Sequence, residues 1–92
     1  MLHILKKPLS SLSLESYIHA WHPEDPVLLI EEAISSLAPD QLLPSWFTLL
    51  FSKQKIFALG LSPQNPIREG VTLIDYEGFV DLVIHHYPIC FW

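Results

Sequence analysis

The sequence has 92 residues, a formal net charge of −5 at pH 7 and 50% hydrophobic residues. This length corresponds to one small domain, which we place at residues 1–92. The chain has only five Lys and Arg residues and no basic stripe, which excludes direct nucleic-acid binding, because phosphate contacts require clustered cations. No apolar run approaches the ~18 residues of a membrane span, so we expect no membrane contact and a cytoplasmic location.

The apolar content is high for a domain of this size. The mean hydropathy is +0.32, and the sequence contains three Trp residues. A small domain hides only roughly 60–65% of the surface that its unfolded chain exposes. Monomers rarely leave large apolar patches in contact with water. We therefore favour an oligomer over an unusually apolar monomer.

The first predicted strand, Leu2–Leu5, is followed by a predicted helix. Ser10 or Ser11 is expected to cap this helix, because a hydroxyl oxygen can accept hydrogen bonds from its free N–H groups. His3 lies inside the strand and is expected to be a hydrogen-bonded core residue or an interface residue. The side chains expected on one side of this helix are Leu14, Tyr17, Ile18 and Trp21.

A second strand and a second helix follow a turn at residues 22–26. Val27–Ile30 is wholly apolar and has the length of a strand. Glu31 and Glu32 then open a short predicted helix, Ala33–Leu37, which Pro39 closes. Alternation of strand and helix predicts a parallel α/β sheet.

The middle of the chain has the least regular pattern. Pro39–Pro44 and Gly60–Gly70 are predicted loops, and Lys55–Leu59 is a predicted strand between them. Ser45–Phe51 is apolar nearly all round. Its periodicity therefore does not decide between a helix and a strand.

The last third of the chain carries the clearest pattern. Val71–Ile74 suits a strand covered on both faces, and Asp75 is expected to cap the helix that follows, which Pro88 ends. Ile89–Trp92 is predicted as a last short strand. The side chains expected on one face of the helix are Tyr76, Phe79, Val80, Val83, Ile84 and Tyr87. We therefore predict a small, mainly parallel α/β sheet with helices on both faces.

Two pairs of charged residues are candidates for chemistry. Glu31 and Glu32 follow a strand, where open α/β sheets bind ligands. Adjacent helical residues point about 100° apart, so we favour a role in stabilising the helix dipole over an acid/base pair. Asp81 and His85 stand four residues apart and can form a carboxylate–imidazole pair. No nucleophile is spaced to join them, so we favour a solvated surface pair.

Cys90 is the single cysteine, which excludes an internal disulfide and a cysteine-based zinc site. Its neighbours Ile89 and Phe91 are apolar, and it lies beyond the carboxyl end of a helix. Desolvation and the negative end of the dipole both disfavour a thiolate there. We favour structural packing, and we assign no catalytic, cofactor-binding or metal-binding residue. Cys90 is the one candidate for a reactive group.

Several segments together resemble the TusB/DsrH family. The most specific is Leu73–Val83, which reads LIDYEGFVDLV, together with the final residue Trp92. Met1–Leu5, Leu28–Ala33 and Phe57–Leu59 also resemble the family and occur in the same order. The resemblance covers the whole chain.

This resemblance implies a small α/β subunit of the DsrE/DsrF/DsrH-like fold. In the TusB branch, the subunit associates with TusC and TusD as a dimer of heterotrimers. That complex relays persulfide sulfur, through TusE, towards 2-thiolation of the wobble uridine in certain tRNAs. The main sulfur-carrying cysteine of the family belongs to the TusD/DsrE partner. The resemblance therefore implies a mainly architectural subunit with no catalysis and no cofactor of its own.

Two departures from the family pattern bear on this interpretation. Some DsrH members carry a cysteine near the end of the first helix, whereas residues 16–22 contain none, which disfavours a role in sulfur oxidation. Gly60–Gly70 replaces a longer, acidic and helical segment of the relatives, on which a partner surface can be built. We predict a TusB-like relay subunit. The alternatives are a DsrH-like subunit for sulfur oxidation, a persulfide carrier that uses Cys90, and a homo-oligomer that binds a small ligand at Glu31 and Glu32.

Overall fold

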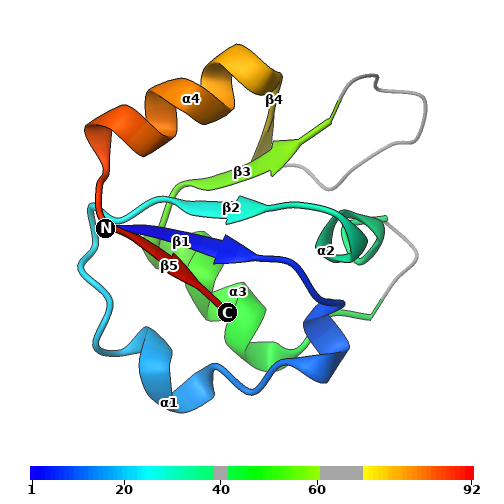
Figure 1. The fold of residues 1–92 in the computed structure, drawn as a ribbon. Coiled ribbons are helices and arrows are strands. Elements are labelled where there is room, and N and C mark those ends of the chain that lie inside the picture. The colour runs from blue at the N-terminus through cyan, green and yellow to red at the C-terminus, as the bar shows by residue number, and fades with distance from the viewer. Residues whose placement is uncertain (39–41, 61–69) are drawn as a thin grey trace.

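A single parallel sheet forms the centre of the computed structural model, which describes residues 1–38, 42–60 and 70–92 (Figure 1). The strand order is β4-β3-β2-β1-β5, and each pair of neighbours is parallel. The strands are β1 (Leu2–Leu5), β2 (Val27–Leu29), β3 (Ile56–Leu59), β4 (Val71–Ile74) and β5 (Ile89–Phe91). The predicted parallel α/β sheet is confirmed.

Helices cover both faces of this sheet, as predicted. The helix α4 lies across one face, and α1 and α3 lie across the other (Figure 1). Parallel strands need such crossovers, because a tight turn cannot join them. The helices are α1 (Glu15–Ile18), α2 (Glu32–Ser35), α3 (Ser45–Lys53) and α4 (Tyr76–His85), and a short 3-10 helix, η1 (Leu9–Ser11), precedes α1.

The core has two halves, one on each face of the sheet. Under α4 the fully buried residues are Leu2, Ile4 and Leu28, from the central strands β1 and β2. The other half is larger, and its fully buried side chains include Leu5, Leu9, Val27, Leu29, Leu37, Phe47 and Leu50. Successive side chains of β1 and β2 point to opposite faces of the sheet. Because both faces are covered, every residue of these two strands is buried.

The segment that periodicity left undecided is the helix α3. It begins after Pro44, a residue that the start of a helix tolerates because the first N–H groups have no partner there. Trp46, Phe47 and Leu50 pack against the sheet and are 7%, 0% and 0% exposed. Packing against the sheet therefore decides the structure of this segment.

The predicted helix cap at Asp75 is confirmed. Its Oδ1 atom accepts a hydrogen bond from the backbone N–H of Gly78 at 2.9 Å. Glu77 lies in the first turn of α4, at the positive end of the helix dipole. The cap fixes where α4 begins and hence which of its residues face the sheet.

The predicted cap at Ser10 or Ser11 is wrong. Both residues lie in or next to η1, and the Ser11 hydroxyl donates to the carbonyl of Pro8 at 2.7 Å. A serine that bonds its local backbone in this way is satisfied without a helix. The helix α1 begins later, at Glu15, after Leu14, which makes no side-chain cap hydrogen bond.

The predicted apolar face of α4 is only partly covered by the sheet. Phe79 and Val83 pack on the sheet, and Leu82, which was not among the predicted members of the face, joins them. The other members of the predicted face are exposed to 69% (Tyr76), 37% (Val80), 67% (Ile84) and 77% (Tyr87). A single helix on a flat sheet buries only the arc of its surface that touches the strands, and the apolar arc of α4 is wider than that.

The strand β4 is an edge strand, so the prediction that it is fully covered is wrong in part. Val71 and Leu73 contact one half of the core and Ile74 contacts the other, but Thr72 is exposed. An edge strand has a neighbour on one side only, which leaves its side chains partly accessible. The predicted closure of α2 by Pro39 and the predicted loop at residues 61–69 lie outside the described residues.

Candidate functional site

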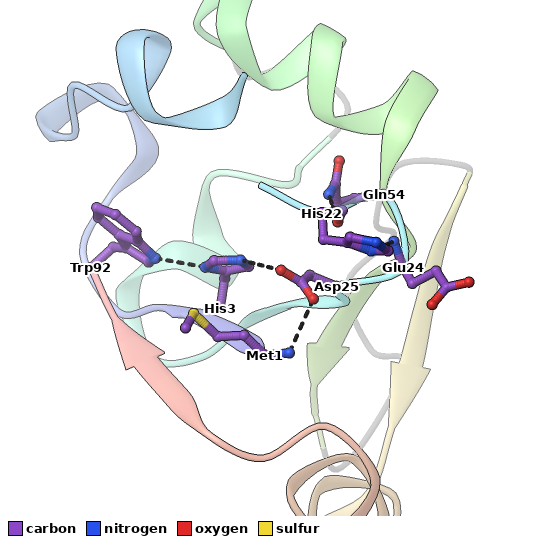
Figure 2. Close-up of polar contacts among 7 residues, drawn as sticks. All are labelled: Met1, His3, His22, Glu24, Asp25, Gln54 and Trp92. Carbon is purple, nitrogen blue, oxygen red and sulfur yellow. Dashed lines mark hydrogen bonds and ion pairs between the residues drawn. The ribbon is translucent and has the colours of Figure 1, made fainter. Parts of the chain in front are cut away.

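A buried hydrogen-bond network surrounds His3, near the amino ends of β1 and β2 (Figure 2). Its Nε2 atom lies 3.2 Å from Oδ2 of Asp25, and its Nδ1 atom lies 3.1 Å from the indole nitrogen of Trp92. An indole N–H can only donate, so Nδ1 must accept and Nε2 carries the proton. His3 is therefore a neutral imidazole that donates to Asp25. The amino group of Met1 also donates to Asp25, at 3.0 Å.

Burial and charge set the ionisation of this network. Burial lowers the pKa of His3 below its ordinary value of 6.5, although the hydrogen bond and the charge of Asp25 oppose this. Burial alone would raise the pKa of Asp25. The hydrogen bonds from the Met1 ammonium and from His3 outweigh it and hold that pKa below 3.8. At neutral pH His3 is uncharged and Asp25 is ionised.

Aromatic rings enclose the imidazole of His3. The ring of Trp21 stacks on it, with centroids 3.8 Å apart and planes inclined by 10°. Trp92 contacts Trp21 with a centroid distance of 5.3 Å, and Tyr17 with a distance of 5.1 Å. The cluster thus joins α1, the segment that follows it and the end of the chain after β5.

An aspartate–histidine pair can serve as a general base, but this one is arranged as an anchor. Trp92 occupies the second ring nitrogen of His3, which a substrate or nucleophile would need. The network also lies near the amino ends of the strands, whereas open α/β sheets bind ligands at the carboxyl ends. The prediction that His3 is a hydrogen-bonded core residue is confirmed. Its partners were not predicted, because they lie 22 and 89 residues away in the sequence.

The turn before β2 is also fixed from the opposite side. Gln54, at the end of α3, donates its side-chain amide to the carbonyl of His22 at 2.8 Å. The backbone N–H of Glu24 donates to Nδ1 of His22 at 3.2 Å. Together with the Asp25 contacts, these bonds make the turn a rigid part of the fold.

Cys90, the candidate reactive residue, lies in the edge strand β5 and is partly buried. In the register of the sheet it stands opposite His3, so the two side chains project from the same face. Both ring nitrogens of His3 are bonded to other groups. The histidine next to Cys90 is thus not available as its base. Sequence reasoning did not foresee this proximity, because it arises from pairing between the two ends of the chain.

The charged pairs lie where the sequence placed them, but neither forms a converging pair. Glu31 and Glu32 are exposed at the carboxyl end of β2, and Glu32 is in the first turn of α2. On α4, Nδ1 of His85 lies 2.8 Å from the backbone carbonyl oxygen of Asp81 rather than bonding its carboxylate. The favoured interpretation of Asp81 and His85 as surface residues agrees with this geometry.

Glu31 has a strained backbone, with φ 53° and ψ −125°. Glycine adopts such angles without the steric cost that a side chain brings. We therefore expect Glu31→Gly to raise the free energy of unfolding by about 1 kcal/mol, measured by urea denaturation. The matched control is Glu32→Gly, inside α2, which should lower it by up to about 1 kcal/mol. A loss of stability in Glu31→Gly would contradict the strain.

A shallow hollow of about 480 Å³ lies between α3 and the segment that contains α1. Its lining residues are Leu12, Ser13, Glu15, Ser16, His19 and Trp46. Cys90, Glu31 and Glu32 lie elsewhere, so the hollow does not join the residues that the sequence singled out. We assign it no chemistry.

The main unpartnered feature of the surface is a line of large apolar side chains on α4. Tyr76, Val80 and Ile84 follow one another at steps of four residues on α4, and Tyr87 lies two residues beyond its end; we call these four residues the α4 stripe. Phe91 in β5 is also 62% exposed. Contiguous exposed apolar residues of this kind mark interaction surfaces. The sequence predicted that these residues share an apolar face with Phe79 and Val83, but it did not predict which part of that face stays exposed.

The described parts of the chain hold no group of three or more His, Cys, Asp and Glu side chains arranged to bind a metal ion. None of the helices in those parts has both the length and the hydropathy needed to cross a membrane. The all-parallel sheet with helices on both faces defines a small α/β protein.

Comparison with known protein families identifies the family to which the chain belongs. The chain belongs to the DsrH-like family, since residues 6–88 match the family described as DsrH like protein. The resemblance to the TusB/DsrH family is thereby confirmed, and membership supports a general role as a sulfur-relay subunit. No curated protein matched the chain.

Proposed function

We propose that this chain is a non-catalytic, cytoplasmic subunit of a TusBCD-type sulfur-relay complex. It assembles with TusC-like and TusD-like subunits as a dimer of heterotrimers. The complex passes persulfide sulfur to a TusE-like carrier, towards 2-thiolation of the wobble uridine in tRNA. The observation that carries the proposal is the exposed α4 stripe in a chain of the DsrH-like family.

The α4 stripe supports a subunit because its exposure is costly for a free protein. Removing a large apolar side chain from water is worth roughly 1.5–3 kcal/mol. Two members of the stripe, Tyr76 and Ile84, are about two-thirds exposed, at 69% and 67%. Contact with another subunit recovers this free energy and explains the apolar composition of the chain.

One feature favours tRNA thiolation over sulfur oxidation, and the net charge is compatible with that role. Residues 16–22 contain no cysteine, whereas some members of the sulfur-oxidation branch carry one in the corresponding place. The net charge of −5 suits a subunit that contacts other proteins and leaves tRNA binding to later members of the relay.

Co-expression with TusC-like and TusD-like chains from the same organism tests this assembly. We expect a tagged form of this chain to retain both partners in a stable ratio through affinity and size-exclusion chromatography. The control is the same tag on an unrelated α/β domain of similar size. Elution of the chain as a monomer, while the partners associate without it, would contradict the proposal.

A further inference from the structure

The α4 stripe has a charged border. Tyr76, Val80 and Ile84 are spaced four residues apart along one line of the helix. Glu77 and Asp81, each one position further along, form a parallel acidic line about 100° round the helix and are exposed. The stripe therefore lies between the residues that face the sheet and a row of carboxylates.

The segment that contains β4, α4 and β5 contributes no strongly basic side chain. Residues 70–92 contain no Lys or Arg. His85 follows Asp81 on the acidic side, and its ring Nδ1 is held by the backbone carbonyl of Asp81. The surface presented to a partner is thus an apolar line bordered by negative charge on one side.

We propose that the α4 stripe binds an apolar surface bordered by Lys or Arg on another subunit of the relay complex. This inference rests on the proposed function, and it specifies which surface of the chain is used and what chemistry the partner presents. The buried apolar side chains supply most of the affinity, and the charges set orientation and association rate.

A second copy of the chain fits this surface poorly. Two copies joined through antiparallel α4 helices, by a two-fold axis perpendicular to them, would place each acidic row close to the other. Carboxylates near the axis, such as Asp81, would face their own copies, and like charges in an interface cost free energy. The net charge of −5 on each copy adds to the repulsion.

Two substitutions at Ile84 distinguish a partner subunit with a basic border from a second copy of the chain. Because its side chain is 67% exposed, neither Ile84→Lys nor Ile84→Glu is expected to unfold the protein, which circular dichroism can verify. Each variant is co-expressed with the TusC-like and TusD-like chains, and the dissociation constant is measured by surface plasmon resonance. Loss of a buried Ile should weaken association at least about tenfold in both.

The order of the two effects reports the charge of the partner. A basic border repels the new Lys and attracts the new Glu, so Ile84→Lys should be weaker than Ile84→Glu. Added salt should narrow the difference between them. The matched control is Leu42→Lys, at a side chain that is 96% exposed before α3 and outside the stripe, which should bind as the wild type does.

Each result has a defined meaning. If the wild-type complex forms and both Ile84 variants bind with unchanged affinity, this inference fails while the proposed function stands. If Ile84→Glu is the weaker variant, the border on the partner is not basic and the inference is overturned. If the isolated chain forms a dimer that Ile84→Glu disrupts, the occupant is a second copy and the inference is again overturned. If the wild-type complex does not form at all, the proposed function fails, and the basic partner fails with it.

Discussion

Replacing His3 with phenylalanine is expected to lower the free energy of unfolding by about 2–4 kcal/mol at pH 7.5. The phenyl ring can keep the stacking contact with Trp21, so the loss isolates the two hydrogen bonds of the imidazole. One of them goes to the ionised Asp25, and loss of the other leaves the partly buried indole N–H of Trp92 without its acceptor. Bonds to charged groups and buried unpaired donors are the costly cases.

The same variant should have an altered dependence of stability on pH. The pKa of His3 is lower in the folded chain than its ordinary value of 6.5, so the unfolded chain binds more protons just below pH 6.5. Stability of the wild type therefore falls as the pH drops below about 6.5, by at most about 1.4 kcal/mol per pH unit from this group. The pKa of Asp25 is also lowered, so its contribution is lost only below about pH 3.8.

Urea denaturation at pH 7.5, 6.0 and 5.0 measures both effects. The gap in stability between the wild type and His3→Phe should narrow as the pH falls. Trp92→Phe is the matched control, since it removes the indole hydrogen bond, together with part of the ring contact with Trp21 and Tyr17, but leaves the bond from His3 to Asp25 in place. It should cost at least about 1 kcal/mol, and the pH dependence that His3 causes should remain. A gap that is constant over this pH range would show that His3 does not titrate as its burial requires.

The strands could be predicted from the sequence because each consists of a short apolar run between polar or turn residues. Leu2–Leu5 and Val71–Ile74 have the predicted bounds, and Val27–Leu29 differs by one residue from the predicted Val27–Ile30. Asp75 could be placed as a cap because capping depends on neighbours in the sequence. Local chemistry is sufficient for features of this kind.

The orientation of α4 could not be predicted in the same way. Periodicity identifies the apolar arc of a helix but not how much of that arc a neighbouring layer covers. The arc of α4 runs from Phe79 and Val83, which touch the sheet, to Tyr76 and Ile84, which do not. Only the placement of the strands beneath the helix decides which part of the arc is free for a partner.

The network around His3 could not be predicted from local sequence patterns. Asp25 and Trp92 reach it only because β5 pairs with β1 and the turn before β2 lies next to them. That pairing also puts Cys90 beside His3 and changes how the only thiol must be considered. Proximity to a histidine is the usual sign of a reactive cysteine, but here the histidine is already bonded at both nitrogens.

Deleting the chain is expected to abolish 2-thiolation of the wobble uridine, whereas Cys90→Ser is expected to leave it intact. A carrier of sulfur needs a nucleophilic thiolate, and Cys90 is the only cysteine that can supply one. It lies in an edge strand rather than at a helix N-terminus, and its neighbour His3 is committed to Asp25 and Trp92. An architectural subunit, by contrast, is needed for assembly and not for its thiol.

The comparison is made in cells that lack the chromosomal copy and express either the wild type or Cys90→Ser. Serine keeps nearly the volume of cysteine but cannot hold a persulfide, so the substitution changes chemistry more than packing. Thiolated tRNA is detected by its slower migration in a gel that contains an organomercury compound, and assembly is followed by co-purification. Loss of the shifted band with the complex still assembled would make Cys90 a sulfur carrier and would end the architectural interpretation. Retention of the band in both strains, together with its absence from the deletion strain, would place the contribution of this chain in its surfaces and not in its thiol.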